Sequence, residues 1–180
     1  MIKGNVDINF VTDEMLNNTV FPESTDTNHA NGLWKTLDVP EPTYPKGSAH
    51  LYQCFGEDCP QWAMDVCNKF DWVQHKQVTI NKLTTGTFIP PHVDSMYRLK
   101  QDLKNNQDTL ENLELVRINI FLQDHQLGHW LNIDDESFDN YNKGDYTFIF
   151  PGVIHTVANL GYKPRYTMQI TGLIDYRLKI

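Results

Sequence analysis

The stretch "RYTMQITG", residues 165–172, alternates strictly between polar and apolar side chains. Its odd positions, from Arg165 to Thr171, are polar, whereas the even positions Tyr166, Met168 and Ile170 are apolar. Successive side chains of a strand point to opposite faces, so the pattern predicts a strand with one polar face. Such a face suits either a solvated edge strand or a barrel interior built to hold an anion. A buried Arg165 would require a structural acid or a bound dicarboxylate as its partner.

The same alternation occurs upstream in "VRINIFL", residues 116–122, where Arg117 and Asn119 share one face. Further short strands are expected between turn signals such as "YNKGD" and "FPG", in "ELVRINIFLQD", "HWLNI", "DYTFIF", "IHTVAN" and "RYTMQITGLIDYRLKI". The acidic run "NIDDESFD" among them is interpreted as a solvated loop. Many short strands after one helix predict a mainly β fold with flanking helices, arranged as an antiparallel sandwich or jelly roll.

The first part of the chain predicts one helix. Residues 1–50, which include "VPEPTYPKG", are rich in Asn, Thr and Pro and are expected to wrap the core. A short amphipathic helix is expected at about 58–70, with Asp58 as its cap and Pro60 in its first turn. The charged segment 97–113 is weakly helical and is interpreted as a solvated insertion.

Length and charge limit the class of protein. A chain of 180 residues fits a single domain, with 1–77 as an N-terminal wrap and helix and 78–175 as a catalytic β-core. The net charge of -8 disfavours nucleic acid and anionic membranes as partners. Without a signal peptide or a membrane-spanning segment in the sequence, a cytoplasmic protein is expected.

Three cysteines lie close together in the sequence: Cys54, Cys59 and Cys67. Their odd number and the lack of a secretory context argue against a disulfide framework. A zinc site would need a fourth ligand and a knuckle motif, and neither is visible. We therefore expect buried free thiols.

A candidate metal site begins in "QVTINKLTTGTFIPPHVD", residues 77–94, which is expected to form two strands joined by a turn or one bent strand, with an interruption at Gly86. His92 and Asp94 are two residues apart, so on a strand they point the same way. Ferrous iron in oxygenases commonly binds two histidines and one carboxylate. His155, which opens a β stretch after a Pro-Gly turn, is the best candidate for the third ligand.

Other histidines and aromatics are weaker candidates. His125 and His129 are four residues apart, but Gly128 argues against the helix that would align them as a metal pair, and turn or rim positions are expected. Trp130 and Tyr97 could line a substrate pocket near a barrel mouth, although a buried aromatic usually belongs to the core.

Four segments, "TGTFIPPHVD", "VRINIFLQD", "GDYTFIFPGVIHTVAN" and "RYTMQITG", together resemble the Fe(II)- and 2-oxoglutarate-dependent dioxygenase superfamily, over roughly residues 78–175. The chain is similar to the prolyl hydroxylase-like and aspartyl/asparaginyl β-hydroxylase-like members. The shared pattern is an HxD…H triad followed by an arginine ten residues after the second histidine. The resemblance implies a double-stranded β-helix, also called a jelly roll or cupin-like barrel.

The resemblance also implies a site and a reaction. The metal ligands would be His92, Asp94 and His155. Arg165 and Thr167 would bind the distal carboxylate of 2-oxoglutarate, while Asn119 and Arg117 would contact its other end or steady the site. With iron(II), O2 and 2-oxoglutarate, supported by ascorbate, such an enzyme hydroxylates a protein side chain or a small metabolite and releases succinate and CO2.

A rival function is a non-oxidative cupin-like domain that binds a metal or a small ligand. Arg165 and Thr167 discriminate between the two, because such a domain has no need for a dicarboxylate clamp. The identity of the substrate is not encoded in any readable motif.

Overall fold

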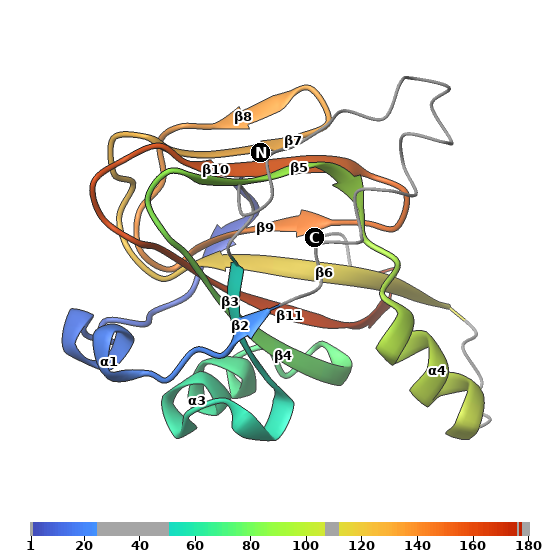
Figure 1. Ribbon diagram of the computed structural model, residues 1–180. Coiled ribbons are helices and arrows are strands. Elements are labelled where there is room, and N and C mark those ends of the chain that lie inside the picture. Colours follow the sequence, from blue (N-terminus) through green and yellow to red (C-terminus); the bar gives the residue numbers. More distant parts are fainter. Residues whose placement is uncertain (1, 25–50, 107–111, 176, 178–180) are drawn as a thin grey trace.

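The computed structural model describes residues 2–24, 51–106, 112–175 and 177. Its strands form two antiparallel sheets that lie face to face as two layers (Figure 1). The large sheet has the order β1-β9-β6-β11-β4-β3-β2, with β1 at Gly4–Asn5, β2 at Glu23–Ser24, β3 at Leu51–Phe55, β4 at Gln74–Leu83, β6 at Leu113–Phe121, β9 at Asp145–Ile149 and β11 at Arg165–Asp175. The small sheet has the order β5-β10-β7-β8, with β5 at Thr87–Val93, β7 at His129–Ile133, β8 at Glu136–Phe138 and β10 at Ile154–Asn159.

The connections between the strands define the fold. From β4 to β11 the chain passes back and forth between the sheets, and β4, β11, β6 and β9 are neighbours in one sheet while β5, β10, β7 and β8 are neighbours in the other. This winding of paired antiparallel strands is a double-stranded β-helix, the jelly-roll architecture. The predicted fold class, mainly β with flanking helices, is confirmed.

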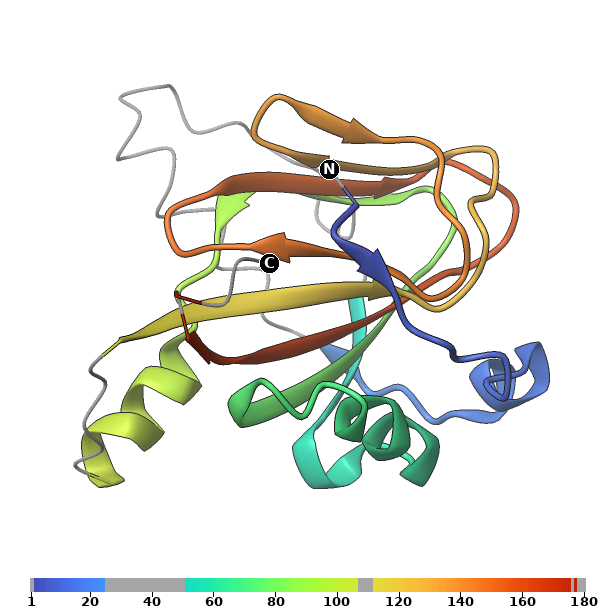
Figure 2. The ribbon, with the colours of Figure 1, turned by 180° about the vertical axis from the view of Figure 1, so that it is seen from behind.

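The helices cover one side of the molecule. They are α1 (Asp13–Asn18), the 3-10 turn η2 (Gly56–Asp58), α3 (Gln61–Asn68) and α4 (Tyr97–Asn106). All lie on the side of the large sheet that faces away from the small sheet (Figures 1 and 2). Within the described ranges, no helix has the length and apolar character that crossing a membrane requires.

The helix expected at 58–70 is confirmed, but it is shorter and it begins later. Pro60 is its N-cap residue, and no side chain caps it, because Asp58 belongs to the preceding 3-10 turn. The cap assigned to Asp58 was therefore wrong. The helix buries the face that carries Trp62 and Val66.

The apolar faces of β6 and β11 point outward from the barrel and pack under α3 and the N-terminal segment. Together with Leu122, which directly follows β6, they contribute Val116, Ile118, Ile120, Tyr166, Met168 and Ile170 to the main hydrophobic core. Their polar faces consequently point into the space between the sheets, next to a second apolar cluster of Phe121, Leu131, Ile133, Phe138, Tyr141 and Ile149. Of the two interpretations of the alternating strands, the barrel interior is correct.

Two segments differ from the prediction. The acidic run "NIDDESFD" is not a loop throughout: Asp134 has a φ of 50°, which reverses the chain, and β8 then pairs with β7. The helix α4 in segment 97–113 is not fully solvated, because Leu99 and Leu103 pack against Leu173 of β11. These two leucines are four residues apart, so they share one helix face.

The strands around Gly86 and the three cysteines can also be compared with the predictions. The segment "QVTINKLTTGTFIPPHVD", residues 77–94, contributes to two strands in different sheets, β4 and β5, which are separated at Gly86 with a φ of 79°. All three cysteines are buried and free, as expected. Burial raises the pKa of the Cys59 thiol to about 12, which keeps it protonated and unreactive. The segment "VPEPTYPKG" lies outside the described residues.

Candidate functional site

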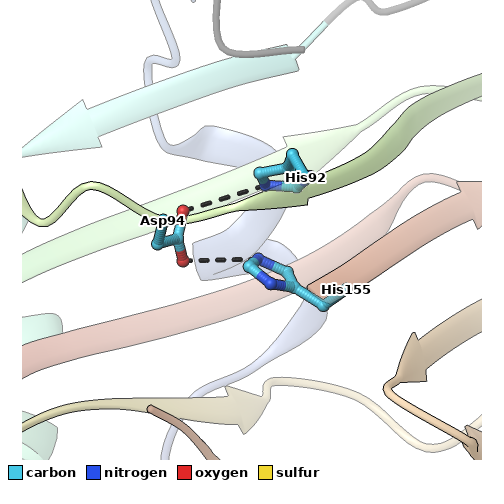
Figure 3. Close-up of side chains that lie close together, drawn as sticks. All are labelled: His92, Asp94 and His155. Atoms are coloured by element: carbon cyan, nitrogen blue, oxygen red, sulfur yellow. Dashed lines mark ion pairs between the residues drawn. The ribbon is translucent and has the colours of Figure 1, made fainter. Parts of the chain in front are cut away.

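Three of the predicted site residues meet at one end of the small sheet. His92 of β5 and His155 of β10 are directly paired across the two strands, and Asp94 follows the end of β5. Figure 3 shows the three side chains converging, with the carboxylate of Asp94 facing both imidazole rings. Among the described residues, this is the group of His, Cys, Asp and Glu side chains whose ligand atoms all lie within 4.8 Å of one another.

The distances suit a small metal ion. Asp94 Oδ1 is 3.8 Å from His92 Nε2, and Asp94 Oδ2 is 3.3 Å from His155 Nε2. Ligands on neighbouring coordination sites of an ion with bonds of about 2.1 Å lie roughly 3 Å apart. The group therefore needs only small adjustments to hold a divalent cation, and two imidazoles with one carboxylate are the donor set of non-haem ferrous sites.

The backbone sets the orientation of both imidazoles. His92 Nδ1 lies 2.8 Å from the Pro90 carbonyl oxygen, and His155 Nδ1 lies 3.2 Å from the Val153 carbonyl oxygen. A carbonyl only accepts, so Nδ1 carries the proton of each neutral ring, and both Nε2 lone pairs are directed at the common centre. Burial, followed by the neighbouring His155, lowers the pKa of His92 to about 4. The ring is therefore neutral near pH 7, the form that binds metals.

Asp94 also has a partner beyond the histidines. The guanidinium of Arg117 on β6 forms a salt bridge with Asp94 Oδ2, and its Nε donates a hydrogen bond of 3.1 Å to the Thr171 hydroxyl. Burial by itself would raise the pKa of Asp94, but Arg117 and the two imidazoles outweigh it and hold the pKa well below the usual range. The carboxylate is thus ionised and held in place from a second side.

A second buried polar group lies at the start of β11. Arg165, the first residue of β11, is only 4 % exposed, and its Nε and Nη2 atoms have no hydrogen-bond partner. Its guanidinium carbon lies 5.9 Å from the centre of the Phe121 ring. Its pKa is lowered by burial, while the Tyr141 hydroxyl beside it acts in the opposite direction. Burial of a guanidinium without an acid is costly, and a bound anion would offset this cost.

Further polar atoms line the same region. Thr167 is buried two residues beyond Arg165 on the same strand, and Asn119 is buried with its Nδ2 atom unpartnered. Tyr141 stacks on Phe121 with ring centres 3.7 Å apart, and its hydroxyl has no hydrogen-bond partner. The sequence offered no signal for Tyr141, because this residue lies in the irregular connection between β8 and β9, outside any periodic pattern.

The weaker candidates have mixed outcomes. His129 is not at a rim: it is the first residue of β7 and is only 2 % exposed. Its position could have been inferred, because it alternates with the inward-facing Leu131. Trp130 is 41 % exposed, and its Nε1 atom donates a hydrogen bond to the Ser137 hydroxyl, so it does not line the interior. The side chain of Tyr97 lies outside what the structure describes.

Fold and site together define a cupin-like double-stranded β-helix protein with a His-His-Asp group suited to a divalent metal. No family model and no curated protein matches the chain. Solved structures with a similar arrangement include a "predicted oxalate decarboxylase" from Thermotoga maritima, with 13% identity over 70% of this chain and 83% of that one at a TM-score of 0.42. A cupin protein from Bacteroides fragilis has 13% identity, coverages of 74% and 82% and a TM-score of 0.38.

The plu4264 protein from Photorhabdus luminescens has 13% identity over 76% of this chain and 88% of that one, at a TM-score of 0.42. At these scores, the assignment of the fold rests on the strand order of the chain itself.

Proposed function

We propose that this protein is an Fe(II)- and 2-oxoglutarate-dependent dioxygenase that hydroxylates a protein side chain or a small metabolite and releases succinate and CO2. The observation that carries the proposal is the buried Arg165, whose guanidinium has two unpartnered nitrogen atoms inside a barrel that also presents a His-His-Asp group. An enzyme that binds a dicarboxylate beside a metal needs both features.

His92, Asp94 and His155 would hold the iron. The donor set fits ferrous iron, and two neutral imidazoles with one carboxylate leave coordination positions free for other ligands. Iron together with the 2-oxo acid would, when bound, activate O2, so that one oxygen atom enters succinate and the other enters a substrate C–H bond. Arg117 contributes by holding the Asp94 carboxylate in one orientation, which limits its loss as a ligand.

Arg165 would bind the distal carboxylate of 2-oxoglutarate. A guanidinium binds a carboxylate through two parallel hydrogen bonds, and its unpartnered Nε and Nη2 atoms are one such pair of donors. The Thr167 hydroxyl and the Asn119 amide lie on the inner faces of β11 and β6 and can donate to the same ligand. Burial of these donors excludes water, so each hydrogen bond is stronger than at the surface.

The rival function, a non-oxidative cupin-like domain that binds a metal or a small ligand, accounts for the His-His-Asp group but gives no role to Arg165. Since an unpaired buried guanidinium costs several kcal/mol, roughly, its presence favours the oxygenase. Binding of metal without binding of 2-oxoglutarate would instead support the rival.

The test is turnover of the co-substrate. With Fe(II), 2-oxoglutarate, O2 and ascorbate, we expect the protein to form succinate and CO2, and His92→Ala or Asp94→Ala to abolish this while the fold remains intact by circular dichroism. Thr156→Ala is the matched control, because Thr156 follows His155 on β10 but bonds the Ile89 carbonyl oxygen instead of joining the metal group. Normal turnover in either ligand variant would reject the assignment.

A further inference from the structure

His129 is a buried titratable group that the proposed mechanism does not use. It pairs with Asn159 at the end of the small sheet, four residues along β10 from His155, a distance of about 13 Å along the strand. It alternates with Leu131 and Ile133, which belong to the cluster between the sheets, so its ring faces the same interior as Arg165.

The hydrogen bonds of His129 leave one ring atom without a partner. Nε2 lies 3.1 Å from the Lys163 carbonyl oxygen, which also accepts a hydrogen bond from the Asn159 amide. Because a carbonyl only accepts, Nε2 carries the proton of the neutral ring. Nδ1 is then a bare lone pair, and it is buried with no hydrogen-bond partner. A lone pair repels an anion, but a protonated Nδ1 would donate a hydrogen bond to one.

The surroundings keep this ring neutral when no ligand is bound. Burial, Arg165 and His125 lower the pKa of His129, and only the Lys163 carbonyl opposes them. The aromatic group nearby is Tyr141, which contacts the His125 ring edge-on and lies beside Arg165. None of the described groups that act on His129 is an acid. An anion bound to Arg165 would therefore be the negative charge that stabilises the protonated ring of His129.

We propose that His129 completes the anion pocket of Arg165, and that it binds the distal carboxylate of the dicarboxylate co-substrate as an imidazolium, taking one proton from the solvent onto Nδ1 as the ligand binds. The inference rests on the proposed function. It makes His129 a specificity residue, since a 2-oxo acid without a distal carboxylate would bind without proton uptake. It also makes the affinity for the co-substrate dependent on pH.

The experiment is calorimetric titration of 2-oxoglutarate into the Mn²⁺-loaded protein, in buffers that differ in their enthalpy of ionisation. We expect an uptake approaching one proton per ligand near pH 7, and an affinity that falls by up to about tenfold per pH unit where the uptake is complete. In His129→Gln, whose side-chain amide can still donate to the Lys163 carbonyl, the uptake should vanish and the affinity should lose its dependence on pH.

Two controls isolate the site. His125→Gln removes the other imidazole at this end of the barrel and should keep the proton uptake. Titration of 2-oxovalerate, which lacks a distal carboxylate, into the wild-type protein should show no proton uptake. This control uses no variant, so it does not depend on a variant being folded. Binding of 2-oxoglutarate without proton uptake, or equal uptake in wild type and His129→Gln, would overturn the role of His129 alone, whereas absence of binding at every pH would overturn the proposed function as well.

Discussion

Replacing Arg165 with methionine should have opposite effects on stability and on ligand binding. The side chain is 4 % exposed, and Nε and Nη2 have no hydrogen-bond partner. In the ligand-free protein, Arg165→Met therefore removes a buried charge that nothing neutralises, and substitutes an apolar side chain of similar length. In the complex it removes the group that would bind the distal carboxylate.

The magnitudes follow from this burial. Exchanging poorly compensated buried charges for apolar side chains is neutral or stabilising by about 1–4 kcal/mol, from which the contact with Phe121 subtracts up to about 1 kcal/mol. For a chain of this length each kcal/mol raises the melting temperature by about 2–4 °C. Loss of a charge-assisted pair of hydrogen bonds costs about 3–4 kcal/mol, which lowers the affinity for 2-oxoglutarate by roughly two to three orders of magnitude.

The matched control is Arg117→Met. Arg117 lies on the inner face of the same sheet but forms a salt bridge with Asp94, so its removal leaves a buried carboxylate unpaired and should destabilise the fold by about 3–5 kcal/mol. Urea unfolding without ligand gives the stability of each variant, and calorimetry with Mn²⁺ and 2-oxoglutarate gives the affinity. If Arg165→Met destabilised the protein as much as Arg117→Met, Arg165 would have a structural partner and the reasoning would be refuted.

Three further results are expected. Burial and the adjacent imidazole lower the pKa of His92 from 6.5 to about 4, so in the metal-free protein the neutral ring should contribute fully to the free energy of unfolding above pH 6.5. Between pH 6.5 and 4 the free energy of unfolding should fall by up to about 1.4 kcal/mol per pH unit. Urea unfolding at several pH values should show a weaker dependence on pH for His92→Gln, and an unchanged slope would count against this assignment. Ile118→Ala, at a fully buried core position, should cost about 2–5 kcal/mol in the same assay, and a cost below about 1 kcal/mol would mean that the core is packed differently. Gly128→Ala should destabilise the protein more than Gly86→Ala. Both glycines have a positive φ, but only at Gly128 would the new methyl group overlap the backbone of Gly161. Equal losses of stability would contradict the close approach of the turns at Gly128 and Gly161.

Much of the fold could be predicted because alternation in a strand is a local signal. The strands β7 and β10 begin and end where "HWLNI" and "IHTVAN" predict, and the two faces of β11 separate as expected. β8 could not be predicted in this way, because its three residues follow an acidic turn and become a strand only by pairing with β7. The spacing of Leu99 and Leu103 indicates the buried face of α4, but their contact with Leu173 could not be predicted, because Leu173 is distant in the sequence.

For the candidate site, too, the features set by local sequence could be predicted, and the contacts between distant segments could not. The spacing of His92 and Asp94 is local, and the resemblance to a known superfamily pointed to His155 and Arg165 across long separations. The resemblance also implied that Arg117 contacts the co-substrate or steadies the site, but its salt bridge with Asp94 and the position of Tyr141 had no such guide, because these contacts depend on segments that only the winding of the barrel brings together. Burial of His129 follows from strand parity, but its unpartnered Nδ1 depends on the loop that places the Lys163 carbonyl oxygen as the acceptor for Nε2–H.

The most direct test of the central claim is a crystal structure of the protein grown with Mn²⁺ and 2-oxoglutarate in the absence of iron. We expect one metal ion bound by His92, Asp94 and His155, with the keto acid on that ion and its distal carboxylate on Arg165. A metal ion bound elsewhere, or an Arg165 paired with a protein carboxylate while the ligand lies outside the barrel, would contradict it.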